Sequence, residues 1–226
     1  MKRALAYEWA RARSLRSTWL LLTASGVLQF ASGLHWGLRR DPGAFVAASG
    51  VAGKLGAVLV AAIGVASFGA DHQHGTLATT RLVLRSPSRI VAARALVTAG
   101  LGGLGGVAMV VLTAAGVAAG GGALPAGEGA AGRAAGAVVL LTVLSGLAGV
   151  ALGGLLRHSG LAIGVFAGWA FVVELVLGVV AGVPATVLPF TGTALFAAPG
   201  IGAFAGLVAV ALTAAAVGTA RGGSLG

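Results

Sequence analysis

The densest group of potential metal-ligating side chains in this sequence is Asp71, His72 and His74, within the stretch DHQHGT. Imidazole and carboxylate groups are both ligands that zinc accepts, so a His-x-His pair beside an aspartate could begin a zinc site. A structural zinc site needs four protein ligands, and the chain contains no cysteine. Because the sequence places no further ligand near these three residues, we expect no metal site.

The residue types also allow catalysis by a serine that is paired with a histidine. An intramembrane enzyme such as a rhomboid-like protease needs a serine and a histidine paired inside the membrane. Ser145 lies in an apolar run with no motif around it, and His158 and Ser159 share a short polar connection. No Gly-x-Ser-x-Gly motif surrounds any of these serines. This enzyme class therefore stays only as an alternative to the functions considered below.

Two ionisable residues interrupt long apolar runs. Lys54 lies in the run 46–69 and Glu174 in the run 160–181. Measured from the ends at 46 and 181, a helical rise places them at similar depths of roughly 12 and 10 Å. A lone charge costs several kcal/mol in lipid, so we expect Lys54 and Glu174 to face each other or a transport cavity. The alternatives are that Lys54 extends outwards to the membrane surface, or that Glu174 is protonated.

The elements that position these side chains are membrane helices. Hydrophobic residues make up 58% of the 226 residues and charged residues only 9%, whereas a soluble domain carries about a quarter charged residues. The mean hydropathy of +1.00 agrees. We therefore expect an all-α integral membrane protein. The net charge of +10 does not indicate nucleic-acid binding, because the basic residues flank apolar runs instead of covering one soluble face.

The apolar runs predict six transmembrane helices in a single domain, 1–226, with no boundary inside it. Each run has about the 20 residues that a helix needs to cross the hydrocarbon core. The first run lacks a clear small-residue cleavage site, which favours a span over a cleaved signal peptide. The six predicted spans lie near 18–38, 46–69, 93–119, 134–155, 160–181 and 200–220.

The distribution of basic residues predicts the orientation of the spans. Six spans place both termini on one side, and cytoplasmic segments carry an excess of Lys and Arg. Of the 15 Lys and Arg residues, Lys54 lies inside a span and only Arg39, Arg40 and Arg133 fall in loops on the side away from the termini. Both termini are therefore predicted to be cytoplasmic. The same side holds Lys2, Arg3, Arg11, Arg13, Arg16, Arg81, Arg85, Arg89, Arg94, Arg157 and Arg221.

The N-terminal residues 1–17 predict a helix in the membrane interface. With 100° of rotation per residue, the apolar side chains form one stripe along the helix, and Glu8 and Arg16 interrupt this stripe. Trp9 would then lie at headgroup depth, with Arg11 and Arg13 towards anionic lipid. The alternative is that these basic residues only set topology. The stripe consists of Leu5, Trp9, Ala12, Leu15 and Trp19.

The polar segment 70–88 predicts a short, positively charged helix between the second and third spans. Gly75-Thr76 is typical of a turn followed by a helix N-cap, because the Thr hydroxyl can accept a hydrogen bond from a free backbone N–H. Ser86-Pro87 predicts a second start, since proline is favoured at the first helical position. That second helix continues into the third span. The alternative is a positively charged loop.

The order of these features resembles the permease subunits of type-2 ABC exporters. The N-terminal basic helix with Glu8 and Trp9 is similar to the connecting helix of that family. The chain differs from the family in the segment between the second and third spans, where Asp71-His72 replaces a frequent Glu-Tyr pair. Family members place short re-entrant helices before the last span, where this chain has Pro184, Pro189 and Pro199. The residues that match the segment between the second and third spans are Asp71, Gly75, Thr76, Arg81, Pro87 and Arg89.

This resemblance implies a permease in the cytoplasmic (inner or plasma) membrane of a bacterium. A separate ATPase subunit would bind ATP and Mg²⁺, because this chain has no Gly-x-x-x-x-Gly-Lys-[Ser/Thr] loop; the chain itself would be no enzyme and hold no cofactor. A second copy or a sister permease would complete the transporter, which would export a drug, a peptide antibiotic, a lipid or another amphipathic substrate. The alternative is a membrane assembly protein without energy coupling. The residues implied in contact with the ATPase are Asp71, Gly75, Thr76, Arg81, Arg85 and Arg89.

Overall fold

The computed structural model describes residues 2–73, 87–124, 128–156 and 158–221, and every regular element in these ranges is a helix. The all-α fold class predicted from the sequence is confirmed for this part of the chain. The elements are α1 (Lys2–Ser14), α2 (Arg16–Leu38), α3 (Ala44–Gln73), α5 (Pro87–Ala119), α6 (Glu128–Leu156), α7 (Ser159–Ala167), the π-helix η1 (Gly168–Val173), α8 (Glu174–Val179), α9 (Pro189–Ala194) and α10 (Ala198–Arg221).

Five stretches of helix in the described ranges are long and apolar enough to cross a membrane. They coincide with the second to sixth predicted spans, which supports a multi-pass membrane protein. The helix that contains the third predicted span is described from Pro87 onwards, and the residues 74–86 before it lie outside the described ranges. The five stretches are Ala44–Phe68, Ile90–Ala119, Gly129–Leu156, Ser159–Val179 and Ala198–Gly218.

Helix α2 occupies the first predicted span but is not among these five. Polar residues such as Gln29 and His35 lower its hydropathy. Its large apolar side chains nevertheless point outwards: Trp19, Leu20 and Val27 are all more than half exposed. Its buried residues are instead small or polar, namely Thr18, Ser25, Gly26, Gln29, Gly33 and Gly37.

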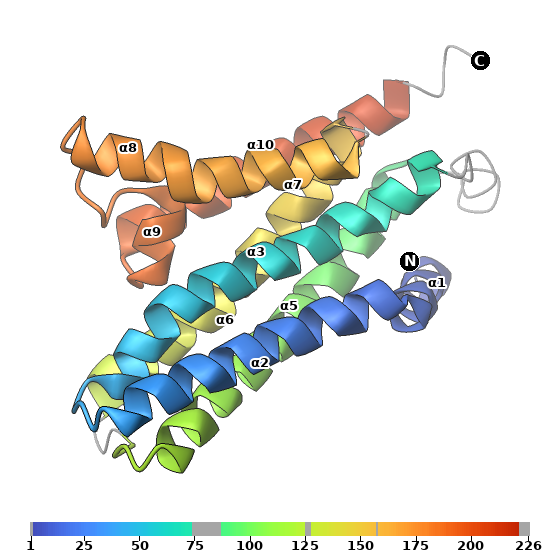
Figure 1. The fold of residues 1–226 in the computed structure, drawn as a ribbon. Coiled ribbons are helices and arrows are strands. Elements are labelled where there is room, and N and C mark those ends of the chain that lie inside the picture. The colour runs from blue at the N-terminus through green and yellow to red at the C-terminus, as the bar shows by residue number, and fades with distance from the viewer. Residues whose placement is uncertain (1, 74–86, 125–127, 157, 222–226) are drawn as a thin grey trace.

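Four long helices form the centre of the molecule, with α3 packed on α6 and α2 packed on α5 (Figure 1). Glycine allows the backbones in these pairs to touch. A Cβ on Gly64 of α3 would collide with the carbonyl oxygen of Gly146 on α6, and a Cβ on Gly33 of α2 would collide with that of Thr113 on α5. Close backbone approach of this kind is how membrane helices associate without a hydrophobic driving force between them.

The C-terminal helices lie along one side of this centre. Helices α7, η1 and α8 follow one another as a rod (Figure 1), and α10 packs on α6, α9 and α5. In the most apolar stretch of the rod only 22% of the residues are buried, and the buried share is also 22% in α10. In α6 the buried share is 61%. The rod and α10 therefore present most of their apolar side chains outwards. The short helix α9 lies between α8 and α10 and packs inwards against α6 and α3.

Candidate functional site

Glu174 is a buried carboxylate, 2% exposed, at the first residue of α8. The π-helix η1 immediately precedes it, and such π-turns often occur at functional sites. The Glu174 Oε1 accepts a hydrogen bond from the Phe190 N–H at 2.6 Å, and Oε2 accepts one from the Thr191 N–H at 2.7 Å. Both donors belong to the first turn of α9, where N–H groups have no partner within the helix. The carboxylate therefore caps α9 from a neighbouring element.

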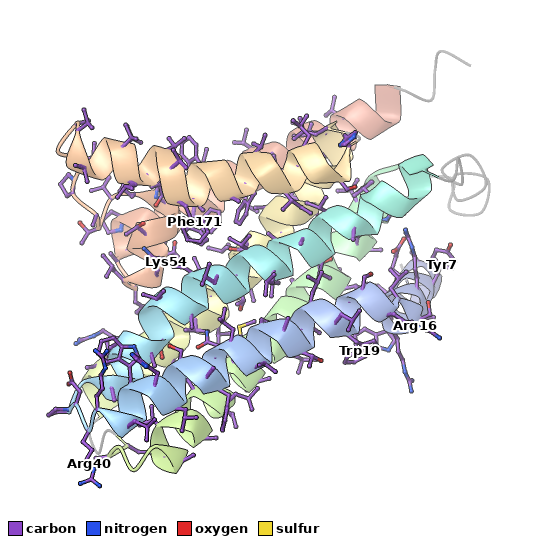
Figure 2. All side chains as sticks on the ribbon, viewed as in Figure 1. Tyr7, Arg16, Trp19, Arg40, Lys54 and Phe171 are labelled. Carbon is purple, nitrogen blue, oxygen red and sulfur yellow. The ribbon has the colours of Figure 1, made fainter. Side chains whose placement is uncertain are left out.

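Lys54 reaches the same turn from α3. Its Nζ donates to the Thr191 Oγ1 at 3.3 Å, and Figure 2 shows its side chain beside α9. Among the contacts of the described residues, Lys54 and Glu174 form no direct ion pair; Thr191 contacts both of them. The structure thus brings together the two ionisable residues that the sequence placed at similar depths, with a threonine of α9 between them.

Aromatic packing fixes α9 further. The Phe190 side chain is 1% exposed and makes edge-to-face contacts with Phe166, Phe171 and Phe204, at ring-centroid distances of 5.9, 6.1 and 6.2 Å. Figure 2 shows Phe171 on the side of the rod that faces α9. Just after α9, Phe196 adopts a left-handed backbone conformation with φ of 55°, which is strained for a bulky residue. The first turn of α9 is therefore held both by the hydrogen bonds to Glu174 and by the packing of Phe190.

The groups of this cluster hold one another in place. Each carboxylate oxygen of Glu174 already accepts a backbone N–H, and these charge-assisted hydrogen bonds are stronger than neutral ones. Such contacts offset the cost of keeping a carboxylate within apolar helices. The cluster is therefore suited to positioning α9 against α3 and α8.

The serine and histidine residues that were considered for catalysis do not form a catalytic pair in the described contacts. The His158 Nδ1 accepts a hydrogen bond from the Leu161 N–H at 3.4 Å, so this histidine caps the start of α7. The Ser145 hydroxyl is buried within α6 without a hydrogen-bond partner. Contacts that the structure describes do not join the two residues.

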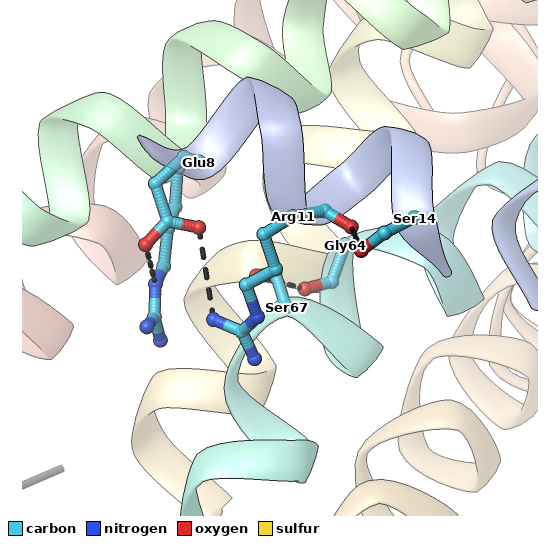
Figure 3. A network of polar contacts seen from close by, with 6 residues as sticks. Glu8, Arg11, Ser14, Gly64 and Ser67 are labelled. Carbon is cyan, nitrogen blue, oxygen red and sulfur yellow. Dashed lines mark hydrogen bonds and ion pairs between the residues drawn. The ribbon is translucent and has the colours of Figure 1, made fainter. Parts of the chain in front are cut away.

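A second buried charge cluster fixes α1 to the bundle. The Glu8 side chain is buried, and its Oε1 lies 3.1 Å from the Arg94 Nε on α5. Arg94 is 1% exposed, and its guanidinium lies 4.2 Å from the centre of the Phe68 ring on α3. The Arg11 Nη1 lies 3.6 Å from Glu8 Oε2 (Figure 3). The ion pairs thus join α1 to α5, and the contact of Arg94 with the Phe68 ring adds α3.

The buried face of α1 differs from the apolar stripe that the sequence indicated, and the place of α1 in the membrane interface stays a prediction. The face of α1 turned inwards carries Ala4, Glu8 and Arg11, whereas Trp9 is 45% exposed and Arg13 is exposed. Arg11 therefore points towards Glu8 and not towards lipid. The attraction between Glu8 and Arg94 outweighs an apolar stripe, because charges interact more strongly away from water.

Sequence reasoning counted Arg94 only as a topology signal. A clue was nevertheless present: Arg94 lies just inside the predicted third span, where a charge needs a partner. Only five acidic residues exist in the chain to supply one.

The predicted ATPase contact segment is described only at its two ends. Helix α3 continues past its predicted end at 69 to Gln73, so the backbone of Asp71 belongs to α3. The backbone of Arg89 belongs to the first turn of α5. Gly75, Thr76, Arg81 and Arg85 lie outside the described residues.

Comparison with models of known protein families and with curated proteins gave no match for this chain. Function is therefore argued from the residues and their geometry.

Proposed function

We propose that the chain is the transmembrane permease subunit of an ATP-driven exporter of the type-2 ABC class, driven by a separate ATPase subunit. One observation carries the proposal furthest. Helix α1 lies at the end of the bundle where α3 ends and α5 begins (Figure 1), and the buried pair of Glu8 and Arg94 fixes it to α5. The segment that the resemblance assigns to the ATPase contact connects these same ends of α3 and α5.

A mechanical argument supports a coupling role for this end of the molecule. Arg94 follows Pro87 by two helical turns or about 10 Å along α5. A partner that moved the connection between α3 and α5 would therefore move Arg94 with it, and through Arg94 also α1. Phe68 lies against Arg94, so the end of α3 belongs to the same unit. The ion pair can thus pass on a displacement to three helices.

The arrangement of α2 supports a six-span topology. Five of its exposed side chains are large and apolar (Trp19, Leu20, Val27, Phe30 and Leu38), and its buried side chains are small or polar, which favours a helix that faces lipid. With α2 as a span, both termini lie on the same side, and the distribution of basic residues favours the cytoplasm. Helix α9, held inwards by Glu174, would then be a short re-entrant helix before the last span.

The proposal includes partners and a substrate class. Exposed apolar faces on the rod 159–179 and on α10 leave room for lipid and for a second permease, either another copy or a sister chain. The ATPase would bind ATP and Mg²⁺. The substrate would be a drug, a peptide antibiotic, a lipid or another amphipathic molecule, exported across the cytoplasmic membrane of a bacterium.

Co-purification tests the proposal directly. The chain is extracted from its native membrane in mild detergent, and associated proteins are identified by mass spectrometry. We expect an ATPase subunit with a phosphate-binding loop, and ATP-dependent movement of an amphipathic dye or labelled lipid after reconstitution. Arg81→Glu should reduce the association, whereas Arg39→Glu, on a residue that stacks on Trp36 at the opposite end of the bundle, should not. Absence of both an ATPase partner and ATP-dependent transport would overturn the proposal.

A further inference from the structure

A cavity of about 260 Å³ lies between α3, α6 and the end of α9, at the end of the bundle away from α1. Its floor is formed by buried, small or apolar residues, including Gly53, Ala137 and Leu141. Its rim is exposed and includes Gly50, Arg133 and Leu195. The cavity is thus open at a charged rim and apolar in its depth.

The shape of the cavity restricts its occupant. The lining residues from Arg133 to Leu141 extend about 12 Å along α6, from the exposed rim to the buried floor. Its volume lies below the range of roughly 300 to 1,000 Å³ that is usual for drug-sized ligands. One hydrocarbon chain of a lipid fits this volume better than a whole drug-sized ligand does.

The charge at the rim indicates what the chain is attached to. Arg133 forms no hydrogen bond or ion pair with the residues that the structure describes. Its guanidinium carries a fork of N–H donors that matches phosphate geometry. An anionic group at the rim would supply the missing acceptor while its apolar chain filled the cavity.

We propose that this cavity binds one hydrocarbon chain of an anionic phospholipid, with Arg133 contacting the phosphate of the headgroup. The lipid site does not depend on energy coupling by an ATPase. Helix α9 forms one wall of it through Ala194 and Leu195, and the hydrogen bonds from Glu174 hold the start of that helix. The cluster at Glu174 therefore helps to hold the helix that forms one wall of the lipid site.

Glycines of the chain provide a matched pair of test variants. A Cβ on Gly50 would meet no atom within 4 Å, so Gly50→Leu can extend into the cavity without a backbone collision. Gly206 on α10 has the same open surroundings and does not line the cavity. Gly206→Leu therefore controls for the loss of a helical glycine.

The test uses the full chain in nanodiscs that contain a phospholipid with a photoreactive diazirine in one acyl chain. Phosphatidylglycerol and phosphatidylcholine with the same chain are compared, and labelled residues are located by mass spectrometry. We expect phosphatidylglycerol to label the cavity residues of α3 and α6. Gly50→Leu should remove this labelling and Gly206→Leu should leave it intact.

Arg133→Gln tests the headgroup contact at an exposed residue that no described contact ties to the fold. It should lower the labelling by phosphatidylglycerol about fivefold, as expected for one basic residue at a membrane surface, and leave that by phosphatidylcholine unchanged. Equal cavity labelling by the two lipids in the unaltered protein, or cavity labelling that survives Gly50→Leu, would overturn the proposal.

Discussion

The Glu8 carboxylate of α1 and the Arg94 guanidinium of α5 form a buried ion pair at 3.1 Å, although 86 residues separate them in the chain. Both side chains are almost fully removed from solvent. Buried pairs contribute little net stability compared with apolar residues of similar shape, but removing one partner takes an opposite charge away from a buried side chain. The pair therefore specifies where α1 docks more than it strengthens the fold.

Removal of either member of this pair should detach α1. Arg94→Met or Glu8→Gln alone should each lower the free energy of unfolding, by about 3–5 kcal/mol where a charge stays behind. The double variant should lose less than the sum of the two, because the two side chains contact each other directly. Unfolding in mixed micelles and proteolysis of α1 measure these effects. Arg13→Gln, on the exposed side of α1, is the control and should change neither; single variants that behave like it would contradict the assignment.

The cluster at α9 predicts unequal effects of its two ionisable residues. Glu174 makes two short hydrogen bonds to backbone N–H groups, whereas Lys54 makes one contact of 3.3 Å to a side chain. Glu174→Gln should therefore cost about 1–3 kcal/mol of unfolding free energy, and Lys54→Met less. Because Thr191 touches both residues, the loss in the double variant should fall short of the sum.

Thr191→Val provides the control for this cluster, since it removes the hydroxyl and keeps the backbone N–H. It should reproduce the effect of Lys54→Met, and its loss should likewise fall short of the sum when it is combined with Glu174→Gln. Effects of Lys54 and Glu174 that simply add would show that the two residues are not coupled through α9.

The contact between α3 and α6 predicts a strong difference between two glycines. A Cβ on Gly64 would collide with the Gly146 carbonyl, whereas one on Gly164 of α7 meets nothing within 4 Å. Gly64→Ala should therefore force the helices apart and cost about 1–3 kcal/mol, while Gly164→Ala should be neutral or slightly stabilising. Unfolding in mixed micelles measures both, and equal stability of the two variants would contradict the backbone contact.

The sequence predicted the long helices because their apolar runs are local and exceed the length of a membrane crossing. It also indicated that Lys54 and Glu174 lie near each other, since the depth of a residue follows from its position in a helix. The partners of Glu174 escaped prediction because they are backbone N–H groups of α9, which no side-chain pattern reveals. The inward face of α1 could not be predicted for a related reason. Arg94, which contacts Glu8 on that face, lies far along the chain.

The position of α2 relative to the membrane yields the last prediction. If α2 is a span, residues just before and just after it lie on opposite sides of the membrane. The chain has no cysteine, so Ser14→Cys and Pro42→Cys, both at exposed positions, each supply a single thiol. An impermeant maleimide should label Pro42→Cys in intact cells and Ser14→Cys only after permeabilisation, because the basic N-terminal segment favours the cytoplasm. Ala123→Cys, in the exposed connection between α5 and α6, should label like Pro42→Cys. Labelling of Ser14→Cys and Pro42→Cys from the same side would show that α2 does not cross the membrane and would leave the five more apolar helices as the spans.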